Sequence, residues 1–196
     1  VGNQSNLILD PDLDSYYAMS LVVLRYPELL EVLNGIGDRL RAHRLQDGDA
    51  QADARTRYLI LEGRLDAVAH GIAADHAEAF AASSPALTAA LAPHRDRVAA
   101  AIEAYRSAAR TQIEGGASAP ANAAVQRTRL ELVDALGMAW AASGVELDRL
   151  LQARIDSLLQ RMWLHLGTAL FLLMVLLVIV YQVARHIAAP LRHLSE

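Results

Sequence analysis

Apolar residues recur at intervals of three and four positions along most of the chain before residue 162, and they form four stripes. The stripes are Met19, Val22, Tyr26, Leu29, Leu33, Ile36 and Leu40; then Tyr58, Leu61, Leu65, Val68, Ile72 and Ala79; then Val98, Ile102, Tyr105 and Ala109, with Leu87 and Leu91 ahead of Pro93; and last Val125, Leu132, Leu136, Ala139, Leu147, Leu151, Ile155, Leu158 and Met162. Such spacing gives an α-helix one apolar face, and no alternating run indicates a strand. The sequence predicts an all-α bundle in which each helix buries one face.

Polar breaks separate the predicted helices. Residues 46–49 form a polar turn, residues 83–85 offer a cap followed by proline, and residues 115–120 end one helix and begin the next. Because short connections join antiparallel neighbours, we expect an up-down bundle. Pro27 lies inside the first stripe and removes a backbone hydrogen bond to Val23, so it should kink that helix rather than end it.

The longest apolar stretch lies between Arg161 and Arg185, where 23 residues carry no formal charge. About 20 apolar residues in a helix span the roughly 30 Å hydrocarbon core of a bilayer. A buried core helix is the alternative, but such a helix needs more polar positions than this run has. We predict a transmembrane helix at 163–184, continuous with the fourth stripe from about residue 121 to about residue 188.

Composition excludes several kinds of site. The net charge is −4 with no basic stripe, so nucleic acid is not an expected partner. Cysteine is absent, which excludes disulfides, thiolate metal sites and cysteine nucleophiles. Asp66 and His70 could face one metal ion, but His76 lies on another helix face. With no phosphate loop, nucleophile elbow or zinc-protease motif, we expect no cofactor, no metal and no enzyme activity in this segment.

The segment from Gly2 to Tyr17 is the most distinctive part outside the apolar run. It offers carboxylates, an amide and two phenols near one helix start, which suits a small polar or cationic ligand; the candidate residues are Asn6, Asp10, Asp12, Asp14, Tyr16 and Tyr17. The alternative is structural, with Asp10 capping a helix that has Pro11 at its first position. Counting from Asp10, the sixth and twelfth positions are Ser15 and Leu21, whereas a calcium loop has glycine and glutamate there. A calcium loop is therefore disfavoured.

This segment also carries a resemblance. The run SNLILDPDLDSYY at residues 5–17, followed by YPELL at residues 26–30, resembles the helical extracytoplasmic sensor domains of bacterial transmembrane receptors. Those domains occur on chemoreceptors, sensor histidine kinases and diguanylate cyclases. In that family further helices commonly precede the motif. Because Val1 is not an initiator Met and an exported N-terminal domain needs an export signal or a first membrane helix, we expect an apolar segment upstream of Val1. From the up-down topology, residues 1–11 would be a juxtamembrane or inter-helix segment.

The last twelve residues, 185–196, resemble the opening of a HAMP signal-conversion domain. The likeness lies in Pro190-Leu191 directly after a membrane helix and in the coiled-coil spacing of Ile187, Leu191 and Leu194. It implies that Pro190 and Leu191 act in signal relay, that the chain is a homodimer, and that this end is cytoplasmic. A basic juxtamembrane anchor with a proline stop is the alternative.

Together these features predict a receptor of the bacterial inner membrane. Residues 12–160 would form a periplasmic sensor bundle that binds a small molecule or a periplasmic binding protein. The membrane helix would pass a ligand-induced displacement to HAMP and to an output such as a histidine kinase, a chemotaxis signalling domain or a cyclic-di-GMP domain. The alternative is a membrane-anchored helical stalk or scaffold without a sensing role.

Overall fold

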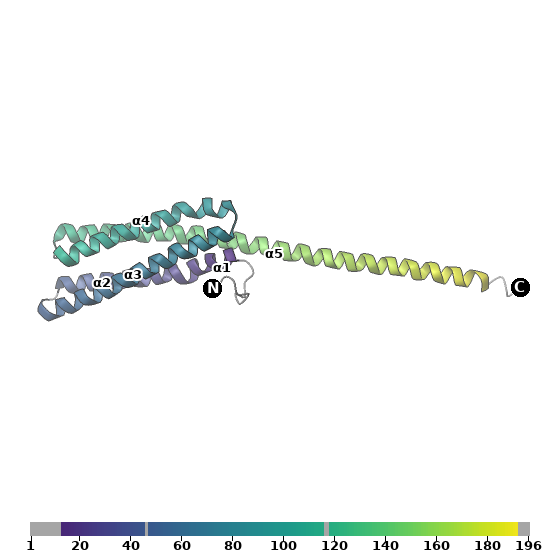
Figure 1. Ribbon diagram of the computed structural model, residues 1–196, viewed down its shortest axis with the longest axis horizontal. Coiled ribbons are helices and arrows are strands. Elements are labelled where there is room, and N and C mark those ends of the chain that lie inside the picture. The colour runs from purple at the N-terminus through teal and green to yellow at the C-terminus, as the bar shows by residue number, and fades with distance from the viewer. Residues whose placement is uncertain (1–12, 46, 116–117, 192–196) are drawn as a thin grey trace. The chain divides into compact units, whose positions relative to one another are not determined.

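The chain forms a sequence of helices that follows the predicted breaks (Figure 1). The computed structural model describes residues 13–45, 47–115 and 118–191. Its elements are α1 (Leu13–Ser20), the π-helical turn η2 (Leu21–Arg25), α2 (Tyr26–Leu45), α3 (Gly48–Ala82), α4 (Pro85–Gly115) and α5 (Ala119–Leu191). Since α1, η2 and α2 are continuous, four helical segments pack as an up-down antiparallel bundle, and the predicted all-α class is confirmed.

Local chemistry accounts for the connections. Gly48 begins α3 with a φ of 59°, a left-handed conformation that favours glycine. At the start of α4, Leu87 N–H donates to the Ser84 carbonyl at 3.1 Å. At the start of α5, Ala121 N–H donates to the Ser118 hydroxyl at 3.3 Å, as at an N-cap. The short connections between the helices reverse the chain, as predicted.

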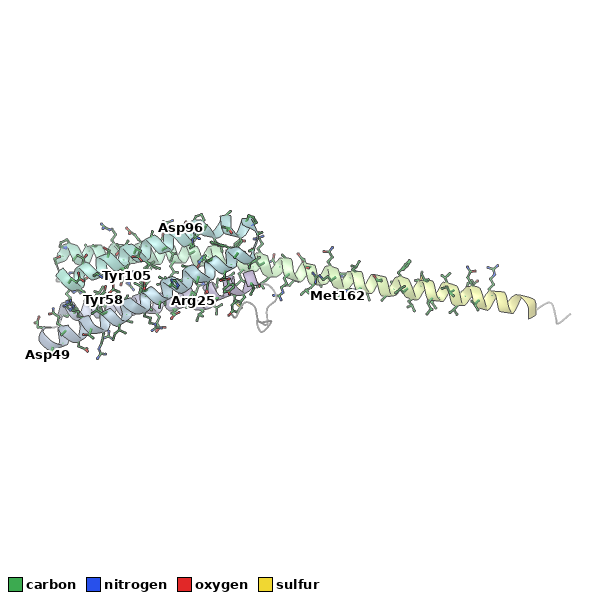
Figure 2. All side chains as sticks on the ribbon, in the orientation of Figure 1. Arg25, Asp49, Tyr58, Asp96, Tyr105 and Met162 are labelled. Atoms are coloured by element: carbon green, nitrogen blue, oxygen red, sulfur yellow. The ribbon has the colours of Figure 1, made fainter. Side chains whose placement is uncertain are left out.

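The bundle core lies in the first of two compact units, Val1–Leu150. The second and third stripes are buried as predicted, except that Leu61 is only partly buried, and the fourth is buried from Val125 to Ala139. Three tyrosines, Tyr26, Tyr58 and Tyr105, are the largest fully buried side chains. Tyr58 and Tyr105 are labelled within the bundle in Figure 2. Each fully buried leucine, isoleucine or valine contributes about 1.5–3 kcal/mol, so the stripes supply most of the stabilisation.

The π-helical turn changes which residues of the first helical segment face the core. Tyr26 N–H donates to the carbonyl of Leu21, five positions earlier. The buried apolar residues just before Tyr26 are therefore Leu21 and Ala18, whereas the predicted stripe named Val22, which is half-buried, and Met19, which is exposed. That prediction is wrong at both positions because a π turn inserts one residue into the α-helical repeat.

Two prolines lie inside helices. Pro27 is the second residue of α2, separated from the π-helical turn by Tyr26, and it does not end the helix, as expected. Pro93 lies within α4, which runs from Pro85 to Gly115. Leu87 and Leu91, ahead of Pro93, therefore belong to the same helix as Val98.

The second unit, Leu151–Glu196, contains only part of α5 among its described residues. The last four apolar residues of the fourth stripe are exposed here: Leu151, Ile155, Leu158 and Met162. The prediction that they are buried is wrong because no second described element of this unit packs on them. α5 is long and apolar enough to cross a membrane, and its side chains project outward along this part (Figure 2).

Candidate functional site

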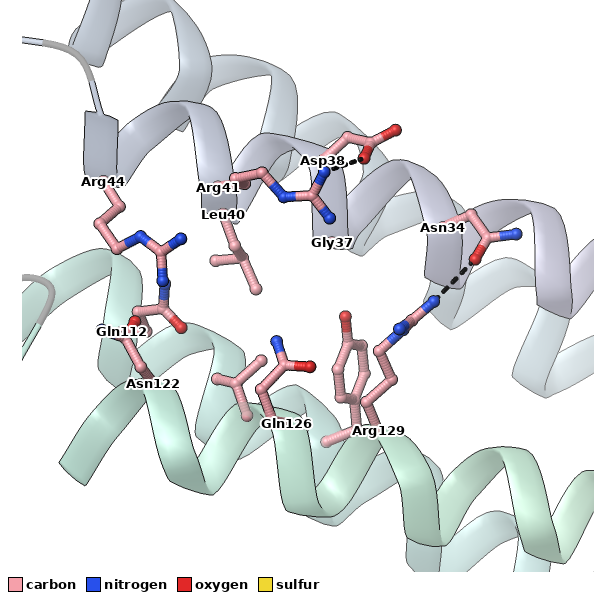
Figure 3. A pocket seen from close by; sticks show the side chains of 12 residues that line it. Asn34, Gly37, Asp38, Leu40, Arg41, Arg44, Gln112, Asn122, Gln126 and Arg129 are labelled. Atoms are coloured by element: carbon pink, nitrogen blue, oxygen red, sulfur yellow. Dashed lines mark hydrogen bonds and ion pairs between the residues drawn. The ribbon is translucent and has the colours of Figure 1, made fainter. Parts of the chain in front are cut away.

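A cavity of about 320 Å³ opens between α2, α4 and α5. It lies at the end of the bundle where α2 connects to α3 and α4 connects to α5 (Figure 3). Its lining is mostly polar and comes from three helices: Asn34, Gly37, Asp38, Leu40, Arg41 and Arg44 of α2; Tyr105 and Gln112 of α4; and Asn122, Val125, Gln126 and Arg129 of α5. The volume is at the small end of the range for ligand sites, roughly 300–1,000 Å³.

The cavity is positively charged in a protein whose net charge is −4. Its lining holds three arginines and a single carboxylate, that of Asp38. This carboxylate lies 3.9 Å from Arg41 Nη1, and both side chains are about two-thirds exposed, so the pair neutralises little. Arg44 forms no ion pair with any of the described residues. The cavity therefore favours an anion.

Buried polar atoms without partners line the same cavity. Tyr105 is fully buried, and its hydroxyl has no hydrogen-bond partner among the described residues. The same holds for Arg129 Nε and Asn122 Oδ1, although Arg129 Nη2 donates to Asn34 Oδ1 at 2.9 Å. Burial raises the pKa of Tyr105 to about 12, against the opposing charge of Arg129, so its hydroxyl stays protonated. A ligand with acceptor oxygens would satisfy the two donors.

A second polar cluster surrounds the π-helical turn. Asp75 of α3 is buried; its Oδ2 accepts from the Ser20 hydroxyl at 2.7 Å and from Arg25 Nε at 2.9 Å. The Arg25 guanidinium lies against Gly71, where an added Cβ would come within 2.9 Å of Arg25 Cζ. These contacts fix the residues at both ends of the π-helical turn to α3.

Beside this ion pair, three buried side chains join three helices. The Tyr26 hydroxyl lies 3.1 Å from Ser143 Oγ of α5 and 3.5 Å from His76 Nε2 of α3. His76 Nδ1 lies 2.8 Å from the Ile72 carbonyl, so Nδ1 carries the proton and Nε2 accepts. Burial lowers the pKa of His76 and raises that of Tyr26, which keeps both groups neutral.

Of the ligand-binding residues predicted from the sequence, Tyr16 and Tyr17 have described side chains, and neither lines the cavity. Asn6, Asp10 and Asp12 lie outside the described residues, as does the side chain of Asp14. The rings of Tyr16 and Tyr17 meet edge to face at 5.2 Å between centroids. Tyr17 packs against the small apolar cluster of Ala79, Leu87 and Leu91, whereas Tyr16 is 38 % exposed. Their placement fits helix packing.

The two relay residues, Pro190 and Leu191, are the last residues of α5. Their side chains lie outside the described residues, so their role stays a prediction. Asp66, considered above with His70, is ion-paired with Arg106 at 2.9 Å. Among the residues that the structure describes, no group of three or more potential metal ligands comes together.

Sequence reasoning missed the cavity. Arg41 and Arg44 are three residues apart on α2, a spacing that places two charges on one helix face. This spacing indicates a cationic face on the helix, but nothing in the sequence connects that face to Arg129. Comparison of the chain with protein families, curated proteins and solved structures finds no match.

Proposed function

We propose that the chain is the sensor and transmembrane portion of a bacterial signal-transduction receptor. One observation carries the proposal: α5 lines the polar cavity through Asn122, Gln126 and Arg129, and the same helix is long and apolar enough to cross a membrane. A ligand that binds one packing of α2 against α5 more tightly shifts the population of that packing. The helix then carries the displacement into the membrane.

The remaining assignments rest on the sequence resemblances. The bundle faces the periplasm, and residues 163–184 cross the inner membrane. Residues 185–196 begin a cytoplasmic HAMP domain, in which Pro190 and Leu191 start the relay to a histidine kinase, chemotaxis or cyclic-di-GMP output. The ligand reaches the cavity as a free small molecule or on a periplasmic binding protein.

A homodimer follows from the same assignment. Exposed apolar side chains on α5 support it, because Leu151, Ile155 and Leu158 recur at intervals of four and three, as in a coiled-coil seam. Pairing two copies along this stripe would bury residues that the single chain leaves exposed. The coiled-coil spacing also suits the parallel helices that a dimeric HAMP requires.

The test is a chimera in which residues 1–196 are joined through a complete HAMP domain to a histidine kinase of known output. We expect a pool of small metabolites to change kinase activity. That change should disappear when Leu159 and Gln160 are both replaced by glycine, which weakens the helix. Replacement of the same two residues by alanine keeps the helix and should keep the response. A folded, membrane-inserted chimera that responds to no pool would instead favour the stalk.

A further inference from the structure

We infer that the cavity between α2, α4 and α5 binds a small dicarboxylate, with one carboxylate at each end. This rests on the proposed receptor function for its role in the cell, but binding itself requires no output. The inference starts from the distribution of charge. Figure 3 shows Arg44 beside Gln112 and Asn122 at one end and Arg129 beside Asn34 at the other.

The two cationic ends are well separated along the bundle axis. Arg44 lies ten positions after Asn34 on α2, which corresponds to about 15 Å of helix at 1.5 Å per residue. The Arg129 guanidinium is turned toward Asn34, and Arg44 extends toward Gln112 and Asn122 (Figure 3). A compact anion such as phosphate contacts one end only, whereas an extended molecule with two carboxylates reaches both.

Between the two ends the cavity offers an apolar surface beside a polar side chain. Leu40 and Val125 line it and are buried, with 3 % and 2 % of their surfaces exposed. The Gln126 amide lies between the same two ends (Figure 3). Methylene groups between two carboxylates would pack on Leu40 and Val125 and gain from burial.

Unpartnered donors strengthen the end near Arg129. Arg129 Nε and the Tyr105 hydroxyl are buried and have no hydrogen-bond partner in the described part of the chain, and both can donate to a carboxylate oxygen. Asn34 holds the guanidinium through Nη2 at 2.9 Å, which positions Arg129 before the ligand arrives. The end near Arg44 is more exposed, so we expect it to add charge attraction and less affinity.

The experiment measures binding to the full 196-residue chain in nanodiscs by isothermal titration calorimetry. The probes are succinate, glutarate and adipate, with acetate, inorganic phosphate and the neutral diamide of adipate as comparisons. We expect at least one dicarboxylate to bind about tenfold or more tightly than acetate, phosphate or the diamide, and to weaken as salt is raised. Equal binding of the diamide, or tighter binding of phosphate, would overturn the inference.

Matched variants locate the site. Arg129→Gln and Arg44→Gln should each weaken dicarboxylate binding by about tenfold. Arg127→Gln on α5 and Arg39→Gln on α2, both outside the lining, should leave it unchanged. Tyr105→Phe should weaken binding, whereas Tyr58→Phe, which also removes a buried unpartnered hydroxyl, should not.

The outcomes separate this inference from the receptor proposal. The inference is wrong if no dicarboxylate binds to a chain that unfolds cooperatively on heating. It is also wrong if binding survives both Arg129→Gln and Arg44→Gln. A chimera that answers a metabolite pool would still support the receptor. Conversely, dicarboxylate binding without any change in chimera output would contradict the receptor and leave the binding site established.

Discussion

Arg25 Nε donates to Asp75 Oδ2 at 2.9 Å, and this contact joins the last residue of a π-helical turn to the neighbouring helix α3. The Ser20 hydroxyl, which precedes the turn, donates to the same carboxylate oxygen at 2.7 Å. One buried carboxylate therefore holds both ends of the turn. We call these contacts of Asp75 with Ser20 and Arg25 the clamp, and we interpret it as the point that fixes the register of the first helical segment. π-Helical turns often mark functional sites.

Removal of the carboxylate should destabilise the bundle. Asp75→Asn leaves Arg25 and Ser20 without their charged acceptor, and we expect a loss of about 2 kcal/mol in the free energy of unfolding. Asp53→Asn breaks the exposed Asp53–Arg57 pair instead and should cost at most about 0.5 kcal/mol. Urea unfolding in detergent, followed by tryptophan fluorescence, measures both. Equal effects would show that the clamp adds nothing beyond a surface pair.

Two glycines of α3 should respond in opposite ways to alanine. Gly63 has open space around its added Cβ, so Gly63→Ala should stabilise the helix by up to about 1 kcal/mol. At Gly71 the new Cβ would lie 2.9 Å from Arg25 Cζ and displace the guanidinium from Asp75. Gly71→Ala should therefore lower the melting temperature. A rise equal to that of Gly63→Ala would mean that Arg25 moves away at no cost.

Acid should weaken the bundle through His76. Burial, with a smaller contribution from Arg95, lowers the pKa of His76 below its ordinary value of 6.5, while Asp75 and Asp96 oppose the shift. The unfolded chain thus takes up a proton as pH falls through 6.5 before the folded bundle does, so this part of the stability is complete above 6.5 and is lost below it.

The measurement is the melting temperature between neutral pH and about pH 5.5, above the range in which carboxylates protonate. We expect a decline in the wild-type chain and a flatter profile in His76→Gln. His70→Gln removes an exposed histidine of the same helix and should keep the wild-type profile. A decline of the same size in His76→Gln would assign the pH dependence to other groups.

The absence of cysteine allows a direct test of membrane topology. Single cysteines at Ser118, which is exposed between α4 and α5, and at Ser195 would provide one thiol on each predicted side. In intact spheroplasts a membrane-impermeant maleimide should label Ser118→Cys only. Labelling of Ser195→Cys should require permeabilisation of the inner membrane. The reverse pattern would place the bundle in the cytoplasm.

The helices could be predicted from the sequence because their determinants are local. Apolar spacing, the turn at residues 46–49 and the caps at Ser84 and Ser118 act over a few residues each. The π-helical turn could not be predicted, since counting back from Tyr26 at intervals of three and four assumes an unbroken α-helix. The buried partner of its two ends, Asp75, lies fifty residues away from Arg25, so no local pattern points to it.

The cavity escaped prediction for a related reason. Its charge depends on Arg44 of α2 and Arg129 of α5, which line one cavity only when the bundle forms. Tyr105 occupies a position in a regular apolar stripe, and that position predicts an ordinary core residue. Its unpartnered hydroxyl becomes visible only when the neighbouring helices are in place. The motif at residues 5–17, in contrast, is distinctive in the sequence itself.

The most direct test of the receptor is the kinase activity of the chimera in nanodiscs, titrated with the dicarboxylate that binds most tightly. The account predicts a saturating change in activity at the concentration that fills the cavity. That change should require about tenfold more ligand in Arg129→Gln, remain as in wild type in Arg127→Gln, and vanish when Leu159 and Gln160 are glycines. Constant activity across a titration that saturates the cavity would contradict the account.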